Sequence, residues 1–203
     1  MANDFDRVKL SFLYKVFRSF GFNSAFINLI KACTDKPWIT PLVNRKPTNF
    51  FQATRGLRQG CLLSSFLYIL MADTLSRKLT AGKIYGIIPS IKSTSGVDSI
   101  NHALFADDTL LLGGASLRMA GFFKEIMQHL CIISGALINN RKSVVYGWNK
   151  DHSTIANISQ FLGFDGYDTW DKVKYLGLPL TLVQNNPSLW MEIISKIKAK
   201  IAS

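Results

Sequence analysis

The sequence has few of the residues that mark disulfide-rich or membrane-spanning proteins. Its three cysteines, Cys33, Cys61 and Cys131, stand far apart, and no two have the spacing of a metal-ligand pair or a redox motif. The longest apolar runs, such as residues 66–72, are far too short to cross a bilayer. No N-terminal stretch has the residue order of a signal peptide. We therefore expect reduced, buried thiols in a soluble, intracellular protein with no membrane partner.

Acidic residues are scarce as well. The chain has 24 Lys and Arg against 13 Asp and Glu, which gives a formal net charge of +11. Residues 1–60 hold ten Lys and Arg and only three Asp and Glu, so most of the surplus lies there. A basic surface suggests a polyanionic partner, because each neutralised phosphate releases counterions. Many basic proteins bind no nucleic acid, however, so the charge leaves this partner open.

Apolar residues are plentiful, and their spacing predicts the secondary structure. A hydrophobic fraction of 48% and 14 phenylalanines exclude a disordered chain. Apolar residues at helical spacing predict helices at 8–20, 26–30, 64–79, 116–133, 154–162 and from 190 onward. Apolar runs between turn residues predict strands at 38–43, 49–54, 84–88, 103–105, 110–112, 143–146 and 174–178, with a turn at 44–47 and a polar loop at 93–99. Together they predict an α+β fold, with helices packed on one face of a mainly antiparallel sheet.

Two adjacent carboxylates, Asp107 and Asp108, interrupt an otherwise apolar hairpin. Burying both charges without a partner would be costly, so we expect them at the turn, in contact with cations. Two carboxylates on a tight turn suit Mg²⁺, which takes a few protein oxygens and keeps its other positions for water and phosphate. Such a two-metal site catalyses phosphoryl transfer. Judged from these residues alone, a solvated Asp-Asp turn remains the alternative.

The surrounding motifs add a family resemblance. Residues 102–109, with Phe105-Ala106-Asp107-Asp108 at their centre, resemble the catalytic hairpin of LINE-type (non-long-terminal-repeat) retrotransposon reverse transcriptases, especially those of plants. Four further blocks resemble the same family in the same order: 6–8 with the helix that follows, 55–60, 134–143 and 175–180. The resemblance implies a reverse-transcriptase palm with the fingers incomplete and the thumb only begun. The reverse-transcriptase domain would cover residues 1–185, and a thumb or connection helix would start within 186–203.

The same resemblance implies an RNA-directed DNA polymerase. Its partners would be an RNA template, a DNA primer and deoxynucleoside triphosphates, and two Mg²⁺ ions would be held by Asp107 and Asp108 as catalytic residues. The family role also allows a nuclear location, and the oligomeric state stays open. The other implied site residues are Phe5, Gln59 and Gly60 at the nucleotide, Lys142 at the leaving pyrophosphate, Arg55 and Arg58 at the template, and Leu176 and Gly177 at the primer.

Each implied role has a plain structural alternative. Phe5 would reject a 2′-hydroxyl by steric contact, or else is a core aromatic at the start of the first helix. Gly60 would permit close approach of the backbone to the nucleotide. Lys142 would act as a general acid, or simply face a phosphate. The two arginines would contact the template backbone or form a solvated basic loop, and the primer-contacting pair also fits an ordinary strand end.

The chain departs from the family pattern in two places. The family's first catalytic Asp stands immediately before the position of Met1, and neither Asp4 nor Asp6 replaces it in register. Residues 55–60 are called here the glycine-glutamine loop. Leu62 and Ser65 stand where the family has prolines, which loosens the turn after this loop.

From these departures we expect a truncated, inactive copy of the polymerase. Two Mg²⁺ ions on two carboxylates would be poorly held, at a cost on the order of thousand-fold in rate. The alternative is a catalytically silent, basic nucleic-acid-binding protein. A metal-dependent nuclease is disfavoured, because no further Asp, Glu or His clusters around the pair in the sequence.

Overall fold

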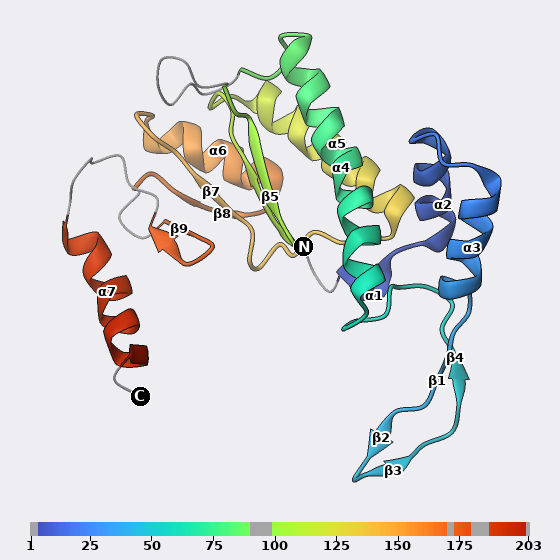
Figure 1. Cartoon of the computed structure of the whole chain (residues 1–203). Coiled ribbons are helices and arrows are strands. Elements are labelled where there is room, and N and C mark those ends of the chain that lie inside the picture. The colour runs from blue at the N-terminus through green and yellow to red at the C-terminus, as the bar shows by residue number, and fades with distance from the viewer. Residues whose placement is uncertain (1–3, 90–98, 170–172, 180–186, 202–203) are drawn as a thin grey trace. The chain divides into compact units, whose positions relative to one another are not determined.

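The computed structural model describes residues 4–89, 99–169, 173–179 and 187–201 (Figure 1). The chain divides into two compact units, Met1–Gly114 with Gly121–Asn139, and Ala115–Ala120 with Asn140–Ser203. The described helices are α1 (Asp4–Arg7), α2 (Leu10–Ser19), α3 (Ser24–Thr34), α4 (Leu62–Ile84), α5 (Leu117–Ser134), α6 (His152–Leu162) and α7 (Pro187–Ile201). The described strands are β1 (Trp38–Ile39), β2 (Leu42–Val43), β3 (Lys46–Pro47), β4 (Phe51–Gln52), β5 (His102–Phe105), β6 (Asp108–Leu111), β7 (Val144–Tyr146), β8 (Asp165–Tyr167), β9 (Lys174–Tyr175) and β10 (Leu178–Pro179).

Mixed helices and small, mostly antiparallel sheets confirm the α+β class. Antiparallel pairs are β1 with β4, β2 with β3, β5 with β6 and β9 with β10, whereas β7 and β8 run parallel. The described strands form five separate two-stranded sheets, so the single sheet that we expected is not present in this part of the chain. The strands are only two to four residues long, and each pairs with a single neighbour. Among the described helices, none is long and apolar enough to cross a membrane.

The core of the first unit is built on α2, as its spacing predicts. Leu13 and Phe17, four residues apart, are 0% and 1% exposed. Helix α2 packs against both α3 and α4. Fully burying one such side chain contributes about 1.5–3 kcal/mol, so this stripe is a main source of stability.

Helix α4 is longer than predicted, and the strand expected at 84–88 is wrong. The helix begins after Cys61, not at Ser64, and continues to Ile84. Gly86 then adopts a left-handed conformation (φ +68°), and the chain turns back. The amide of Ile88 donates to the carbonyl of Gly82 at 3.0 Å, and the Ile88 side chain comes within 2.9 Å of the position that a Cβ on Gly82 would take. Ile88 is therefore buried by folding back over the helix rather than by strand pairing.

Other boundaries shift by a few residues for local reasons. The helix predicted at 8–20 begins at Leu10, and a separate short helix that was not predicted, α1, precedes it. Helix α3 begins at Ser24, two residues before the predicted start at 26, and is capped by Asn23, whose side chain accepts from the amide of Phe26 at 2.8 Å. The strand predicted at 174–178 is a hairpin of two short strands, with its turn at Leu176 and Gly177. The loop predicted at 93–99 lies outside the described residues, apart from its last residue.

The second unit contains a parallel β7-α6-β8 motif. Helix α6 connects the two strands and packs against both of them. Asp151 caps this helix by accepting from the amide of Thr154 at 2.9 Å, and Gly163 ends it in a left-handed conformation. Hydrogen bonds from the hydroxyls of Ser153 and Thr154 hold the pKa of the Asp151 carboxyl well below its usual range.

The end of α5 is joined to the chain between α1 and α2. The amide of Lys9 donates to the carbonyl of Ser134 at 2.7 Å, and Arg7 Nε donates to the carbonyl of Gly135 at 3.1 Å. Gly135 has φ +85°, and a Cβ there would lie 2.5 Å from the Arg7 carbonyl oxygen. Only glycine fits this contact without moving the backbone.

We expect Gly135→Ala to destabilise the protein by more than about 2 kcal/mol, since the left-handed strain of about 1–2 kcal/mol adds to a backbone clash. The measurement is urea unfolding followed by circular dichroism. Gly21→Ala is the matched control, because Gly21 has nearly the same φ (+84°) and nothing within 4 Å of its Cβ position. Equal losses in the two variants would contradict the packing argument.

Candidate functional site

The acidic pair lies on a hairpin, as predicted. Strands β5 and β6 pair in register from His102 opposite Leu111 to Phe105 opposite Asp108. Ala106 and Asp107 form the two-residue turn, in which Ala106 has φ +48°. Asp107 is in the turn and Asp108 opens β6, and both residues are exposed. The turn therefore presents two carboxylates to solvent without burying either charge.

Exposed carboxylate oxygens are the ligand type that Mg²⁺ accepts, so the pair fits this ion in donor chemistry. The set is small. Across the described ranges, no three His, Cys, Asp or Glu side chains gather in a group that could hold a metal ion. Within the described residues, Asp107 and Asp108 would therefore be the carboxylates that bind Mg²⁺, with no third ligand of this kind grouped with them.

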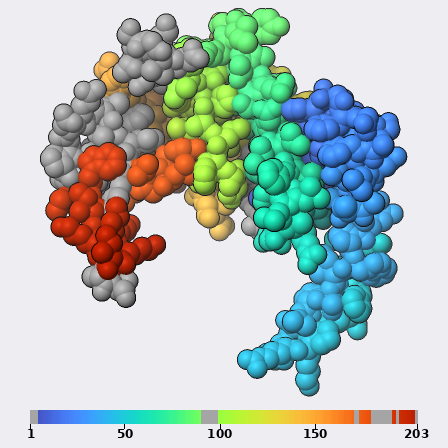
Figure 2. Space-filling view, in the orientation of Figure 1, coloured from blue at the N-terminus to red at the C-terminus, as the bar shows by residue number. Residues whose placement is uncertain are grey.

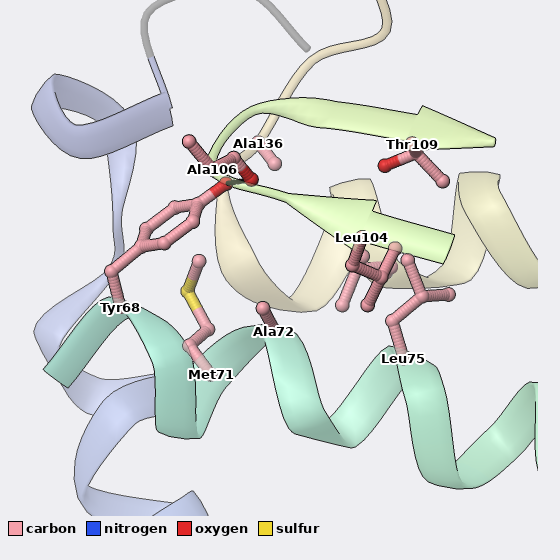
Figure 3. A pocket seen from close by; sticks show the side chains of 9 residues that line it. Tyr68, Met71, Ala72, Leu75, Leu104, Ala106, Thr109 and Ala136 are labelled. Atoms are coloured by element: carbon pink, nitrogen blue, oxygen red, sulfur yellow. Dashed lines mark hydrogen bonds between the residues drawn. The ribbon is translucent and has the colours of Figure 1, made fainter. Parts of the chain in front are cut away.

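Helix α4 supports the hairpin from below (Figure 3). Side chains of Met71, Ala72 and Leu75 line the space under Leu104 and Ala106. The remaining void is about 10 Å³, roughly the size of one water molecule. It is too small for a nucleotide, so the hairpin rests on a packed support and any substrate must bind on its exposed side.

Tyr68 links this support to Phe5. Its hydroxyl donates to the carbonyl of Ala106 at 3.1 Å, in the turn that carries the acidic pair. Its ring stacks on Phe5, with the centroids 4.5 Å apart and the planes 14° from parallel. One side chain, only 4% exposed, therefore connects α1, α4 and the hairpin. Phe5 and the turn that carries Asp107, which the sequence singled out separately, are thus held by the same neighbour.

Tyr68 was not among the residues that the sequence singled out. It is buried on α4, whereas the nearby Phe66 is 66% exposed. The spacing of Tyr68 to Met71 and Leu75, three and seven residues on, is a helical signal that could have revealed it.

The glycine-glutamine loop docks along the first residues of the described chain. The amide of Gly56 donates to the carbonyl of Val8 at 2.8 Å, and the amide of Leu57 donates to the carbonyl of Phe5 at 2.6 Å. A Cβ on Gly56 would lie 2.7 Å from the Asp6 carbonyl oxygen, so this approach requires glycine. The loop and Phe5, fifty residues apart in sequence, are neighbours in the structure.

Gln59 also joins this cluster. Its side-chain amide donates to Asp6 Oδ1 at 3.0 Å, which fixes the orientation of an exposed side chain. Gly60 has φ +76° and nothing within 4 Å of its Cβ position, so it serves the turn and leaves space beside it. Arg55 and Arg58 are exposed on the same loop. Of the predicted residues, Phe5 and the members of this loop are therefore brought together.

The remaining predicted residues lie in the second unit. Lys142 is exposed just before β7. Leu176 and Gly177 form the turn of the β9–β10 hairpin, with φ of 53° and 79°. A leucine with positive φ is strained, and such strain is found at functional sites. The roles predicted for these three residues stay predictions.

His102 anchors β5 to α4. Asn101 Nδ2 donates to the carbonyl of Leu79 at 2.8 Å, so its Oδ1 faces His102 Nδ1 at 2.7 Å and accepts from it. The other ring nitrogen, Nε2, lies 2.8 Å from the Ser76 hydroxyl and accepts from it when the ring is neutral. Burial lowers the pKa of His102 below its ordinary 6.5, and the positive charge of Lys83 adds to this shift. Burial and the charge of Lys83 therefore favour the neutral imidazole.

We expect Tyr68→Phe, which keeps the stack on Phe5 and removes the bond to Ala106, to cost about 1 kcal/mol. Tyr68→Ala removes both contacts and leaves a cavity, so its cost should reach about 3–5 kcal/mol. Urea unfolding measures both losses, and hydrogen exchange at the amides of residues 106–108 reports the hairpin itself. Tyr85→Phe is the control, since Tyr85 is 79% exposed. Unchanged hairpin exchange in Tyr68→Phe would contradict the anchoring role.

The lowered pKa of His102 predicts a pH dependence. A histidine whose folded pKa lies below its unfolded value stabilises the fold fully above the unfolded value, and this contribution is lost as pH falls towards the folded pKa. We therefore expect the stability advantage of the native chain over His102→Gln to be larger at pH 7.5 than at pH 5.5. Unfolding free energies at both pH values measure it, with His129→Gln as the control at an exposed histidine. An advantage that grows at the lower pH would contradict the neutral assignment.

Comparison with known proteins agrees with this geometry. A sequence model of the family "Reverse transcriptase (RNA-dependent DNA polymerase)" matches residues 1–180, which include the acidic hairpin and the glycine-glutamine loop. An uncharacterized mitochondrial protein of Arabidopsis thaliana is 40% identical over 68 residues, or 34% of this chain. That similarity spans 56% of the relative's own length. Because the family match covers most of the sequence, the chain belongs to the reverse transcriptase family.

Proposed function

We propose that the chain forms the palm of an RNA-directed DNA polymerase of the LINE-type class, with the thumb starting after residue 185. Its substrates would be an RNA template, a DNA primer and deoxynucleoside triphosphates. The observation that carries the proposal is the hairpin turn, which presents Asp107 and Asp108 above a packed helix. Mg²⁺ held by these carboxylates would supply activation of the primer hydroxyl and charge stabilisation at the phosphate.

The chain's own residues would bind and orient the substrates. Phe5 would lie under the incoming sugar and reject a 2′-hydroxyl by contact, and its stack on Tyr68 limits how far the ring can retreat. Gln59, oriented by Asp6, would contact the nucleotide next to Phe5. In the second unit, Lys142 would give a proton to the leaving pyrophosphate.

Two further contacts would hold the nucleic acid. Arg55 and Arg58 are exposed cations on the loop beside Phe5, and they would neutralise template phosphates. Leu176 and Gly177, at the turn of their hairpin, would contact the backbone of the primer.

A second candidate is nucleic-acid binding without catalysis, by a copy that has lost its polymerase activity. The net charge of +11 supports it, because binding to phosphates needs cations but no metal site. The two candidates differ in one measurable property, primer extension, and share another, salt-sensitive RNA binding.

The test is Mg²⁺-dependent extension of a labelled DNA primer on an RNA template by the purified chain. Any extension that the chain supports should fall by about a thousand-fold or more in Asp107→Asn and in Asp108→Asn, since the metal ligand acts in the transition state. Asp165→Asn, at an exposed aspartate of β8, is the matched control. RNA binding, measured in parallel, should persist in all three variants.

Two outcomes would count against the proposal. Extension that survives in both hairpin variants would show that the metal site is assigned to the wrong residues. RNA binding by the native chain with no extension would favour the second candidate.

A further inference from the structure

Residues 36–60 form a strongly basic segment of the first unit, called here the basic ribbon. It contains five Lys and Arg and no Asp or Glu. All five cations are exposed, and they are Lys36, Arg45, Lys46, Arg55 and Arg58. Figure 1 shows the two-stranded part of the ribbon extending away from α2 and α3, and Figure 2 shows it in space-filling form as a narrow light-blue projection. Its charge is thus displayed to solvent and is opposed by no carboxylate within the segment.

Aromatic side chains are exposed on the same ribbon. Trp38 and Phe50 are each 67% exposed, and Phe51 is 50% exposed. Trp38 pairs with Gln52 and the next residue, Ile39, pairs with Phe51, so Trp38 and Phe51 belong to neighbouring pairs on opposite faces. Large exposed aromatics gathered on one segment mark a binding surface, because their solvation is unfavourable.

The ribbon has a defined backbone. Its turn, at Asn44 and Arg45, has both residues in the left-handed region, which is the geometry of a tight hairpin turn. Antiparallel pairing at the tip and the base is joined by a bond from the amide of Thr48 to the carbonyl of Pro41 at 2.9 Å. The segment from Trp38 to Val43 contains β1 and β2 and spans about 17 Å at the usual rise of an extended chain, which is enough for a few nucleotides.

The base of the ribbon leads directly to the candidate site. Gly56 and Leu57 bond to the backbone beside Phe5, and Gln59 follows them. A strand lying on the ribbon would therefore reach the glycine-glutamine loop without leaving the basic segment.

We propose that the basic ribbon binds single-stranded RNA, with its cations on the phosphates and with Trp38 and Phe50 stacked on bases. Cations combined with exposed aromatics are the chemistry of single-strand binding, since every base has a face to stack. A protein partner is less well matched, because the centres of protein interfaces are depleted in charge. The inference rests on the proposed function only in identifying the RNA as the template.

The test is fluorescence anisotropy of a labelled 15-nucleotide oligouridylate with the full chain, between 50 and 200 mM salt. A Trp38→Ala, Phe50→Ala variant should bind at least about five-fold more weakly at every salt concentration, because one stacked base contributes about 1–3 kcal/mol. An Arg45→Gln, Lys46→Gln variant should instead reduce the slope of log affinity against log salt by about 1.4, since each phosphate contact on a single strand contributes about 0.7.

Matched controls lie in the second unit. Trp148→Ala removes an aromatic of nearly equal exposure (64%), and Arg118→Gln with Lys150→Gln removes two exposed cations. Neither should change affinity or slope as the ribbon variants do. Unchanged thermal unfolding of the ribbon variants shows that a loss of binding is not a loss of fold.

Affinity and slope that match the native chain in both ribbon variants would overturn the proposal. So would a dimer in sedimentation that dissociates in Trp38→Ala, Phe50→Ala while RNA binding stays native, since the ribbon would then be covered by a second copy. Asp107→Asn separates this inference from the proposed function. If Asp107→Asn still extends primers while the ribbon variants bind RNA more weakly, only the polymerase assignment is wrong. If the ribbon variants bind RNA normally while Asp107→Asn abolishes extension, only the proposal for the ribbon is wrong.

Discussion

The first unit depends on the backbone bonds made by residues 5–9. This short segment offers carbonyls at Phe5 and Val8 to the glycine-glutamine loop, and the amide of Lys9 to the end of α5. Buried polar backbone groups need partners, and here the partners come from two distant parts of the chain. Gly56 and Gly135 make the approach possible, because a Cβ at either position would meet backbone atoms of residues 6 or 7. The positions of Phe5 and Gln59 follow from these contacts.

Sequence periodicity predicted most of the helices, because an amphipathic stripe is a local property. The stripe of α2 and the hairpin around Asp107 and Asp108 appear where their patterns indicated them. The strand expected at 84–88 failed for a reason that no local pattern contains. Ile88 is buried against Gly82 of the preceding helix, and the apolar run that resembles a strand is the return of the chain over that helix.

The candidate site was likewise predictable only in part. Motifs identified its members, including the acidic pair and the loop with Gln59, but not the contacts that position them. The bond from Gln59 to Asp6 and the stack of Phe5 on Tyr68 each join residues more than fifty positions apart. The role of Tyr68 was not predicted because it depends on contacts with Ala106 and Phe5, which are distant in sequence. A sequence pattern shows only which side of a helix is apolar.

The attachment of the first residues also has a kinetic consequence. Arg7 bonds to Gly135 across 128 positions, and Lys9 Nζ bonds to the carbonyl of Ile132 across 123. Contacts between such distant residues form slowly, because closing a large loop costs conformational entropy before the contacts stabilise the chain. During synthesis the N-terminal segment must wait until α5 has left the ribosome before it can dock. The contacts of Arg7 and Lys9 with the end of α5 are therefore expected to be among the last in the unit to form.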